Sequence, residues 1–499
     1  MNFIKSFAVL FFILAIAAHS SEIPPGNPIS DRLYLVAREL YGRGLLQKYE
    51  YGIEGGYLDD SVSAAKSLIR KYNLLSRDFA DAESAPGISA SLWLLSSLRH
   101  ADKTVNYVKL FPQLSINFDK RLAAKVFYRV DGELSDDPRY DGKSWNGSSG
   151  LVENASLEYL GDSFGIRFGV ERFSWGMGRY ANLMLSRQAM PMTMFGLSYR
   201  KSIFQFESVA GFLSPLKDQL DQMENDTSFF TSQQRYLSAH SLSIRPHGNL
   251  SLSLRELVLY GGPGRRLEPA YLFPLIWYHG EQLNSRMDDN SMFAIAADYR
   301  KAGKLWLYGE LLVDDIQVDN DTRGDYEPDQ LAYLAGIELY DLLVAGTSGG
   351  IEYGRVNNWT FNQARAHNRH INSNFPIGYP DGPDNDHLNW FLSSWVTGDI
   401  LLSYNGSYRR LGEGRIDSPW SRPWLDSDQY FEPFPSGTVE RRLLTSLEAL
   451  ILVKNWIWGN LRFDFTDISN VENIPSQDDK GWEIRLDIGM KLPPFNREL

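Results

Sequence analysis

The chain has 499 residues, a formal net charge of −12 and no cysteine. Without cysteine, disulfide bonds, thiolate metal sites and the cysteine-linked anchor of a lipoprotein are excluded. The acidic balance argues against nucleic acid as a partner, because contacts to phosphates need clustered Lys and Arg side chains.

Residues 1–20 have the organisation of a secretory signal peptide. Lys5 supplies a positive charge, residues 7–18 form an apolar core, and small residues suited to cleavage occur up to Ala17 and Ser20. The alternative is an uncleaved membrane anchor, but the apolar stretch is short for a helical span of about 20 residues. We therefore predict that the mature chain is exported.

Residues 21–104 predict a periplasmic helical region. A second helix is expected from Ser61, and a third short element includes residues 92–98. Because helices with one apolar face must bury it, we expect a small bundle packed against the periplasmic end of a barrel, with a separate soluble domain as the alternative. The first helix is indicated by apolar residues spaced three and four apart, Leu33, Val36, Ala37, Leu40 and Tyr41.

From about Val105 onward the apolar period becomes two, and residues 105–499 predict a large antiparallel transmembrane β-barrel. A soluble sandwich also alternates, but repetition over roughly 390 residues favours one closed sheet, with lipid outside and a polar lumen inside. The fold class is therefore mainly β. The alternation is clearest at residues 124–131, 166–171, 250–255, 400–405, 461–466 and 484–491.

The length of this region sets the expected number of strands. One spanning strand of about 10 residues, with its share of turn and loop, takes roughly 20–25 residues, which gives about 16–18 strands. Side chains need not fill a barrel of this size. Long polar connections, which belong outside the cell in such a barrel, lie at residues 132–150, 215–234, 314–330, 357–389 and 411–439.

Motifs for catalysis or metal binding are weak. No nucleophile elbow, phosphate-binding loop or His-Glu-x-x-His motif occurs. Residues 319–324 begin like a calcium loop, but Arg323 stands where an oxygen ligand is required. His367, His370 and His387 lie near several aspartates, yet their spacing does not show the convergence that zinc needs. We expect polar loops here, with no metal and no cofactor.

Five aromatic residues in the long connections are candidates for carbohydrate binding. They lie among Asp, Asn and Arg, so a ring could pack on the apolar face of a sugar while polar neighbours bind its hydroxyls. The alternative is packing within the loops or in the interfacial girdle of a membrane barrel. The candidates are Trp359, Trp390, Trp420, Trp424 and Tyr430.

Several stretches resemble the Wzi family of capsule-assembly proteins, which are outer-membrane barrels with a small N-terminal helical bundle. The resemblance is scattered over most of the mature chain. The stretches are the helical segment 33–46, Trp175-Gly176-Met177-Gly178 with the following residues to Pro191, Glu268-Pro269 with Asp288-Asp289-Asn290, and Ile377-Gly378-Tyr379-Pro380-Asp381-Gly382-Pro383-Asp384-Asn385-Asp386.

The resemblance implies a non-enzymatic, lectin-like protein of the bacterial outer membrane, with its helical region in the periplasm. Such a protein would assist surface attachment or assembly of capsular or extracellular polysaccharide. Its expected partners are surface polysaccharide, outer-membrane lipid and lipopolysaccharide, and no catalytic residue is transferred. Two other functions remain open: a porin-like or substrate-specific channel, and an enzyme modifying lipid or glycan at the outer leaflet, for which the sequence nominates no residue.

Overall fold

The computed structural model describes most of the chain from residue 86 onward and a few residues before it. The predicted signal peptide, most of the predicted helical region and the calcium-like segment 319–324 lie outside the described residues. The described residues are 38–39, 41–43, 86–119, 121–137, 140, 142–216, 233–301, 303–317, 326–373, 375–397, 399–426, 430–454, 457–492 and 495–498.

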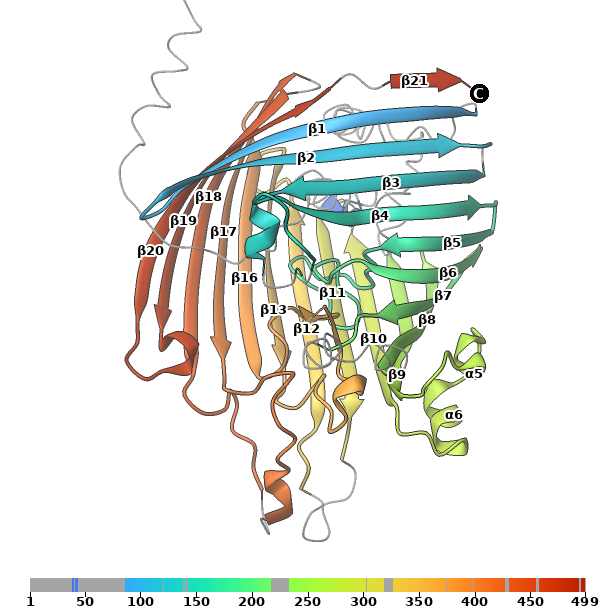
Figure 1. Ribbon diagram of the computed structural model, residues 1–499. Helices are drawn as coiled ribbons and strands as arrows, with labels where there is room; N and C mark the ends of the chain where they lie inside the picture. The colour runs from blue at the N-terminus through green and yellow to red at the C-terminus, as the bar shows by residue number, and fades with distance from the viewer. Residues whose placement is uncertain are drawn as a thin grey trace, which may run out of the picture.

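Within these ranges, eighteen antiparallel strands form one closed barrel when β20 and its short continuation β21 are counted as one (Figure 1). Each strand pairs with its neighbour along the chain, and β1 closes the barrel by pairing with β20 and with its continuation β21. The predicted antiparallel barrel is confirmed, at the upper end of the expected strand number. The strands are β1 Gly87–His100, β2 Thr104–Asn117, β3 Leu122–Asp131, β4 Ser149–Leu160, β5 Phe164–Glu171, β6 Met192–Lys201, β7 Phe204–Leu213, β8 Gln233–His247, β9 Leu250–Pro263, β10 Asn290–Lys301, β11 Leu305–Asp315, β12 Gln330–Tyr340, β13 Thr347–Val356, β16 Asn385–Trp395, β17 Ile400–Leu411, β18 Glu440–Lys454, β19 Ile457–Ser469, β20 Asp479–Lys491 and β21 Phe495–Glu498.

The connections differ between the two ends of the barrel. One end has only short turns, and the other carries long connections, which places the long connections outside the cell and the short turns in the periplasm. None of the described helices is long and apolar enough to cross a membrane. The elements between the strands are η4 Glu133–Asp136, α5 Pro269–Leu272, α6 Tyr278–Asn284, η6 Ala366–Asn368, the pair β14 Ile371–Asn372 and β15 Phe375–Pro376, η7 Pro423–Asp426 and η8 Val471–Asn473.

The barrel begins earlier than the sequence predicts. Residues 92–98, expected as a short helical element, lie in the first strand β1, so the predicted boundary at residues 104–105 is wrong. Trp93 and Leu95 point into the barrel and are buried, whereas Leu98 is exposed on the outer wall. Because apolar residues occupy both faces of β1, the period of two is hidden in the sequence.

The outer wall follows the predicted alternation. Phe168, Leu254 and Ile488 are each more than half exposed, while their neighbours Glu171 and Asp487 on the opposite face are buried. An outward apolar band with a polar inner face is the pattern of a barrel that spans a membrane. The facing predicted for these strands is therefore confirmed.

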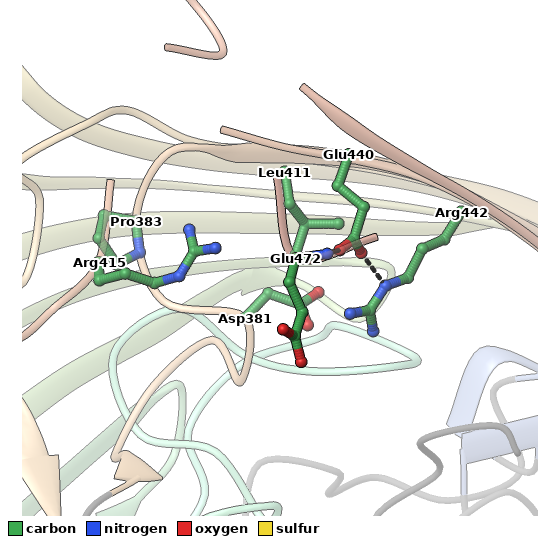
Figure 2. Close-up of a pocket in the computed structure, with 7 residues that line it drawn as sticks. All are labelled: Asp381, Pro383, Leu411, Arg415, Glu440, Arg442 and Glu472. Atoms are coloured by element: carbon green, nitrogen blue, oxygen red, sulfur yellow. Dashed lines mark hydrogen bonds and ion pairs between the residues drawn. The ribbon is translucent and has the colours of Figure 1, made fainter. Parts of the chain in front are cut away.

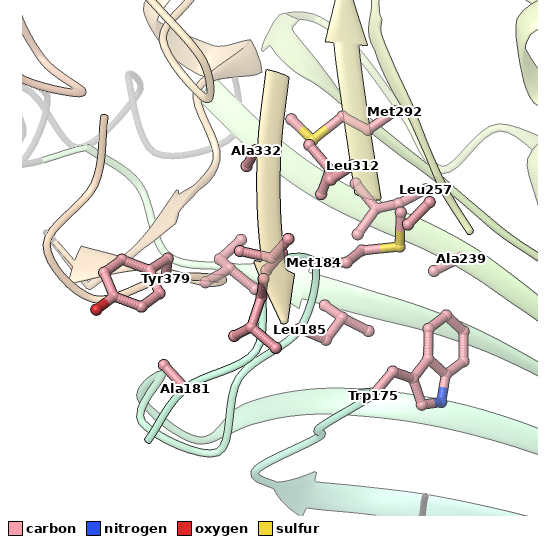
Figure 3. Packing of buried hydrophobic residues seen from close by; sticks show 14 of the residues in the cluster. Trp175, Ala181, Met184, Leu185, Ala239, Leu257, Met292, Leu312, Ala332 and Tyr379 are labelled. Carbon is pink, nitrogen blue, oxygen red and sulfur yellow. The ribbon is translucent and has the colours of Figure 1, made fainter. Parts of the chain in front are cut away.

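Residues 172–191, the connection between β5 and β6, fold into the lumen. Trp175, Leu183, Met184 and Leu185 in this lumen segment are all buried. They form one apolar cluster with inward-facing wall residues, among them Leu257 on β9, as Figure 3 shows. This side of the lumen is therefore packed with protein and has an apolar core of its own.

A short helical turn before the barrel, residues 38–39 and 41–43, lies at the periplasmic end. The Arg43 guanidinium contacts Asp341 in the turn between β12 and β13 at 2.8 Å. The hydroxyl of Tyr41, a residue predicted on the buried face of the first helix, donates to Asp298 on β10 at 3.2 Å. The rest of the predicted helices lies outside the described residues.

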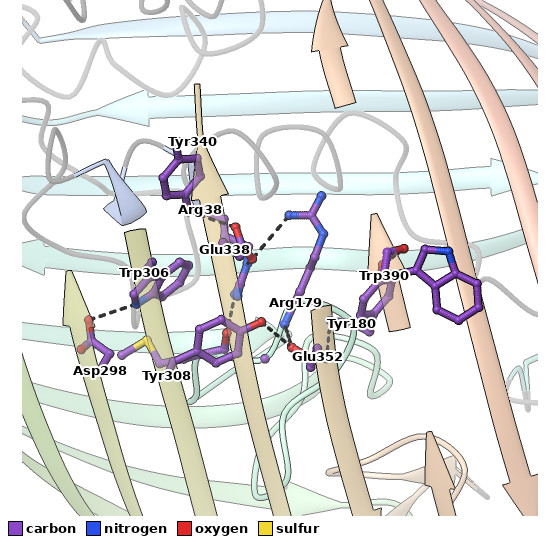
Figure 4. Close-up of polar contacts among 12 residues, drawn as sticks. Arg38, Arg179, Tyr180, Asp298, Trp306, Tyr308, Glu338, Tyr340, Glu352 and Trp390 are labelled. Carbon is purple, nitrogen blue, oxygen red and sulfur yellow. Dashed lines mark hydrogen bonds and ion pairs between the residues drawn. The ribbon is translucent and has the colours of Figure 1, made fainter. Parts of the chain in front are cut away.

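Arg38 of this N-terminal turn is fully buried inside the barrel. It donates to Glu338 on β12 at 2.6 Å, and its guanidinium lies over the rings of Trp306 and Tyr308 at 4.3 and 4.7 Å (Figure 4). Arg38 also donates to the carbonyl of Met177 in the lumen segment. The N-terminal turn, the wall and the lumen segment are thus joined by one buried side chain.

Candidate functional site

Four of the five predicted aromatic residues meet at the extracellular end of the barrel. Trp359 lies in the connection between β13 and β16, and the other three lie in the connection between β17 and β18. Trp359 contacts Trp420 and Trp424 with ring centroids 5.2 and 5.3 Å apart, and Trp424 contacts Tyr430 at 6.3 Å, all edge to face. We call Trp359, Trp420, Trp424 and Tyr430 the aromatic cluster.

Trp390 is not part of the aromatic cluster. It lies within β16 on the same face as Leu388 and Leu392, which are exposed on the outer wall. In Figure 4 its ring points away from the polar group around Arg38. The prediction that Trp390 lies in a loop is wrong. Strand β16 begins at Asn385, so Trp390 belongs to a strand.

A carboxylate ties the aromatic cluster together. Glu432 accepts hydrogen bonds from the Asn358 side chain at 2.7 Å, from Trp359 Nε1 at 3.0 Å and from the Tyr430 hydroxyl at 2.5 Å. Burial and this hydrogen bond raise the pKa of Tyr430. Sequence analysis missed Glu432 and Asn358, and the only local signal was that Glu432 follows Tyr430 by two residues.

The aromatic rings differ in accessibility. Trp359 is 8% exposed and Trp424 is 1% exposed, so their ring faces are used for packing between the two connections. Trp420 and Tyr430 are half-buried, and Phe431 beside them is 86% exposed. A ring can pack against a sugar only through an accessible face, so Trp420 and Tyr430 are the members of the aromatic cluster suited to that contact.

Asp384 links the same two connections. Its side chain is fully buried and accepts hydrogen bonds from the Gly414 amide at 2.9 Å, the Ser436 amide at 2.9 Å and the Ser436 hydroxyl at 2.5 Å. Its carbonyl accepts from the Gly412 amide at 2.8 Å. Backbone donors that would otherwise be buried without partners are thereby satisfied, which fixes one connection against the other.

A charged cavity of about 380 Å³ lies at this end of the barrel (Figure 2). Figure 2 shows Arg415 on one side and Arg442 on the other, with the carboxylates of Asp381, Glu440 and Glu472 between them. Carboxylates accept and guanidiniums donate hydrogen bonds, so the cavity offers both partners that a sugar hydroxyl needs. Its lining residues are Asp381, Pro383, Leu411, Arg415, Glu440, Arg442 and Glu472.

Two of the three cavity carboxylates are held by arginines. Glu440 pairs with Arg442, and Asp381 pairs with Arg409 at 3.1 Å. Glu472 is exposed, and its carboxylate has no hydrogen-bond or ion-pair partner among the described residues. Polar groups fixed by neighbours can receive a ligand without the entropy loss of ordering them first.

Two of the three histidines singled out in the sequence stack on different aromatic rings, and one of these, His387, lies in β16 rather than in a loop. His370 stacks on Phe361 with centroids 4.9 Å apart, and His387 stacks on Tyr379 at 4.5 Å. Burial lowers the pKa of His370 to about 3, so this side chain is neutral at physiological pH. In the described ranges, no three or more His, Asp or Glu side chains gather as a metal site would require. His370 and His387 therefore contribute to packing through their stacked rings.

The closed sheet, the apolar outer wall and the polar groups at its long-loop end define an outer-membrane β-barrel. The model of the capsule assembly protein Wzi family matches residues 112–478, which is more than half of the chain. The chain therefore belongs to this family, as its motifs indicated.

Comparison with solved structures gives the same architecture. Wzi from Escherichia coli, an outer-membrane protein involved in group 1 capsule assembly and described as a carbohydrate-binding β-barrel, matches with a TM-score of 0.59 and 13% identity over 94% of this chain and 98% of that chain. OprD from Pseudomonas aeruginosa is more distant, with a TM-score of 0.45 and 11% identity over 83% of this chain and 98% of that one. A search of curated proteins found no match.

Proposed function

We propose that this protein assists surface attachment or assembly of capsular or extracellular polysaccharide by binding it, without catalysis, at the extracellular end of the barrel. Membership of the capsule assembly family supports this proposal. So does the likeness to the Escherichia coli barrel, which is itself described as carbohydrate-binding. The partner is a surface polysaccharide, and the barrel wall contacts outer-membrane lipid and lipopolysaccharide.

The observation that carries the proposal is the pairing of two features on the same connections. The connection between β17 and β18 contributes Arg415 to the charged cavity and Trp420 and Tyr430 to the aromatic cluster. Accessible ring faces would pack on the apolar faces of sugar residues, while carboxylates and guanidiniums would bind their hydroxyls. A long polymer can use both features at once, which gives avidity from weak individual contacts.

A channel is the second candidate, and the lumen argues against it. The lumen segment packs against the inner wall, and the N-terminal turn is fixed to both by Arg38. A transport path would have to displace an apolar core.

The non-enzymatic part of the proposal is supported by the use of three of the four carboxylates at this site, the fourth being the exposed Glu472. Asp381 and Glu440 are paired with arginines, and Asp384 accepts backbone amides from the neighbouring connection. A general acid or base needs a carboxyl group free to exchange a proton with a substrate. These three instead hold the site together.

Deletion of the gene tests the proposal in the cell. Surface glycan is expected to move from the cells to the culture medium, while the total amount made stays similar. Unchanged retention on the deletion strain would overturn the proposal. A fall in total glycan would point to synthesis or export instead.

Binding by the purified barrel tests the site. Trp420→Ala combined with Arg442→Gln is expected to weaken retention of polysaccharide extracted from the same cells. Trp145→Ala removes an aromatic side chain that is 79% exposed on the connection between β3 and β4, and it serves as the matched control. Equal binding of the polysaccharide by the parent protein, the double variant and Trp145→Ala would contradict this location of the site.

A further inference from the structure

The outer wall has a polar patch on four neighbouring strands. Leu254 on β9 and Leu242 on β8 are exposed outward. Glu256 and His240 lie on the same face of these strands, two positions closer to the extracellular end. These two residues are paired in register, and their side chains lie 3.2 Å apart. Ser208 on β7, Ser238 on β8 and Ser291 on β10 extend the patch on the same outer face.

Charged and polar side chains on the face of a barrel that meets lipid are destabilising. Here they do not meet lipid, because residues 264–289 form a helical hairpin that covers them. Figure 1 shows α5 and α6 outside the barrel beside β9. Tyr271 and Tyr278 of this α5–α6 hairpin pack on the outward residues Tyr236, Val258 and Tyr260.

The contacts to the polar patch are specific. Glu256 accepts hydrogen bonds from the backbone amides of Tyr278 at 3.1 Å and His279 at 2.8 Å, at the start of α6. The His279 ring contacts the Ser291 hydroxyl at 3.0 Å. The wall and the α5–α6 hairpin therefore satisfy each other's polar groups.

The opposite face of the α5–α6 hairpin is apolar and exposed. Leu275 is 73% exposed, Leu283 63% and Trp277 60%, and Phe273 is also exposed. Residues 269–277 carry no charged side chain. An exposed apolar surface of this kind marks a contact with a partner or with a membrane.

We propose that the α5–α6 hairpin lies in the outer leaflet of the outer membrane, where its apolar face contacts lipid at the boundary between headgroups and acyl chains. The barrel wall has no outward apolar side chains at Glu256 and His240, and the apolar face of the α5–α6 hairpin takes their place there. Short helices with one apolar face sit at this depth, whereas non-helical backbone is not tolerated deeper in the hydrocarbon.

Continuity with the lipid-facing wall favours lipid over a protein partner. The α5–α6 hairpin rests on β8, β9 and β10, directly above the exposed side chains of Leu242, Leu254 and Ile295 on the same outer face. The charged side chains of this connection lie mainly toward its two ends at the barrel rim, where Arg265 pairs with Asp289 at 2.9 Å. The surface that would face acyl chains is therefore the uncharged one.

The absence of cysteine in the chain allows a site-specific test. Leu275→Cys and Leu283→Cys are each labelled with an environment-sensitive fluorophore, and the barrel is placed in nanodiscs that hold a single copy. Ile295→Cys on β10 is the lipid-facing control, and Asp417→Cys on the connection between β17 and β18 is the water-facing control. Heat-modifiable gel migration verifies that each labelled variant is a folded barrel.

Both hairpin labels are expected to resist quenching by aqueous iodide and to lose emission with lipids brominated near the headgroup. Ile295→Cys is expected to respond more to bromine placed deeper in the chain. Hairpin labels that behave like Asp417→Cys would place the hairpin in water and overturn the proposal. Labels shielded from both iodide and brominated lipid would mean contact with protein and would also overturn it.

Discussion

The side chains that organise the extracellular site do so by joining distant parts of the chain. Glu432 receives three side-chain donors, two of which come from the connection before β16. Asp384 performs the same task from the opposite connection. The aromatic residues, which are conspicuous in the sequence, depend on these two carboxylates for their arrangement.

Replacing Glu432 with alanine is expected to loosen the extracellular site while leaving the barrel intact. Asn358, Trp359 and Tyr430 would lose their acceptor, and an unsatisfied buried donor costs about 1–3 kcal/mol. Limited proteolysis should cut residues 412–439 faster, with unchanged heat-modifiable migration. Glu472→Ala, which removes an exposed carboxylate, is the control, and equal proteolysis of both variants would contradict this role.

His370 is expected to limit stability in acid. Its folded-state pKa of about 3 lies below the ordinary value of about 6.5, so folding favours the neutral ring. The resulting stability is fully present above pH 6.5 and is lost as the pH falls toward 3, at a cost of up to a few kcal/mol.

His370→Phe keeps an aromatic ring against Phe361 and removes this titration. The unfolding temperature of the variant should fall less between pH 7.5 and pH 4 than that of the parent protein. His247→Gln removes an exposed histidine and should leave the parent profile unchanged. An identical acid loss in His370→Phe would show that the buried ring does not titrate in this way.

At the scale of elements, alternation located most strands but failed where both faces of a strand are apolar. β1 was missed for this reason, since its inward residues Trp93 and Leu95 join an apolar cluster inside the barrel. The described part of the predicted first helix is helical and buries Tyr41 as its spacing predicts, but it also buries Arg38, which the spacing does not predict. A buried arginine cannot be recognised from periodicity, because its partner is far away in the sequence.

The N-terminal turn is expected to depend on the pair of Arg38 and Glu338. Arg38→Met leaves the buried Glu338 carboxylate with Arg179, at 3.5 Å, as its remaining ionic partner, so the cost is expected below the about 3–5 kcal/mol of a fully broken buried ion pair. Hydrogen exchange at residues 41–43 should rise, while the strands stay protected.

The double variant Arg38→Met with Glu338→Met removes both charges of this pair but leaves Arg179 without Glu338, so it should recover only part of the protection. Protection equal to the parent in the single variant would show that the turn is held by other contacts. Failure of the double variant to recover would assign the effect to lost packing on Trp306 and Tyr308 or to the loss of Glu338 beside Arg179.

At the scale of the whole molecule, the barrel is large enough for an aqueous channel, and its own chain occupies one side of the lumen. Barrels of 16–18 strands leave room for water unless loops or segments fill them. The lumen segment provides that filling through a buried apolar cluster shared with the wall. The lumen segment therefore narrows any path through the barrel on the side that it fills.

Replacing residues 176–189 with a short Gly-Ser linker is expected to open the barrel. Planar bilayer recordings should show a stable conductance in this variant and little or none in the parent protein. Shortening the connection between β17 and β18 by removing residues 419–431 is the control, because it leaves the lumen segment in place. A large conductance in the parent protein would contradict a filled lumen.

The sequence alone determined the barrel, the facing of most strands and the position of five long connections, but not of the connections 172–191 and 264–289. These properties follow from a local period of two and from local composition, which do not depend on distant contacts. It also nominated the aromatic residues, four of which the fold brings together.

Only the tertiary structure decided which connections turn inward, which pack on the outer wall and which carboxylates hold the site. Arg38 and Glu338 are 300 residues apart, and Trp359 and Glu432 are 73 apart. A pattern within one segment carries no information about such partners. Closure of the sheet brings the segments together, and burial then selects the pairs that satisfy each other's hydrogen bonds.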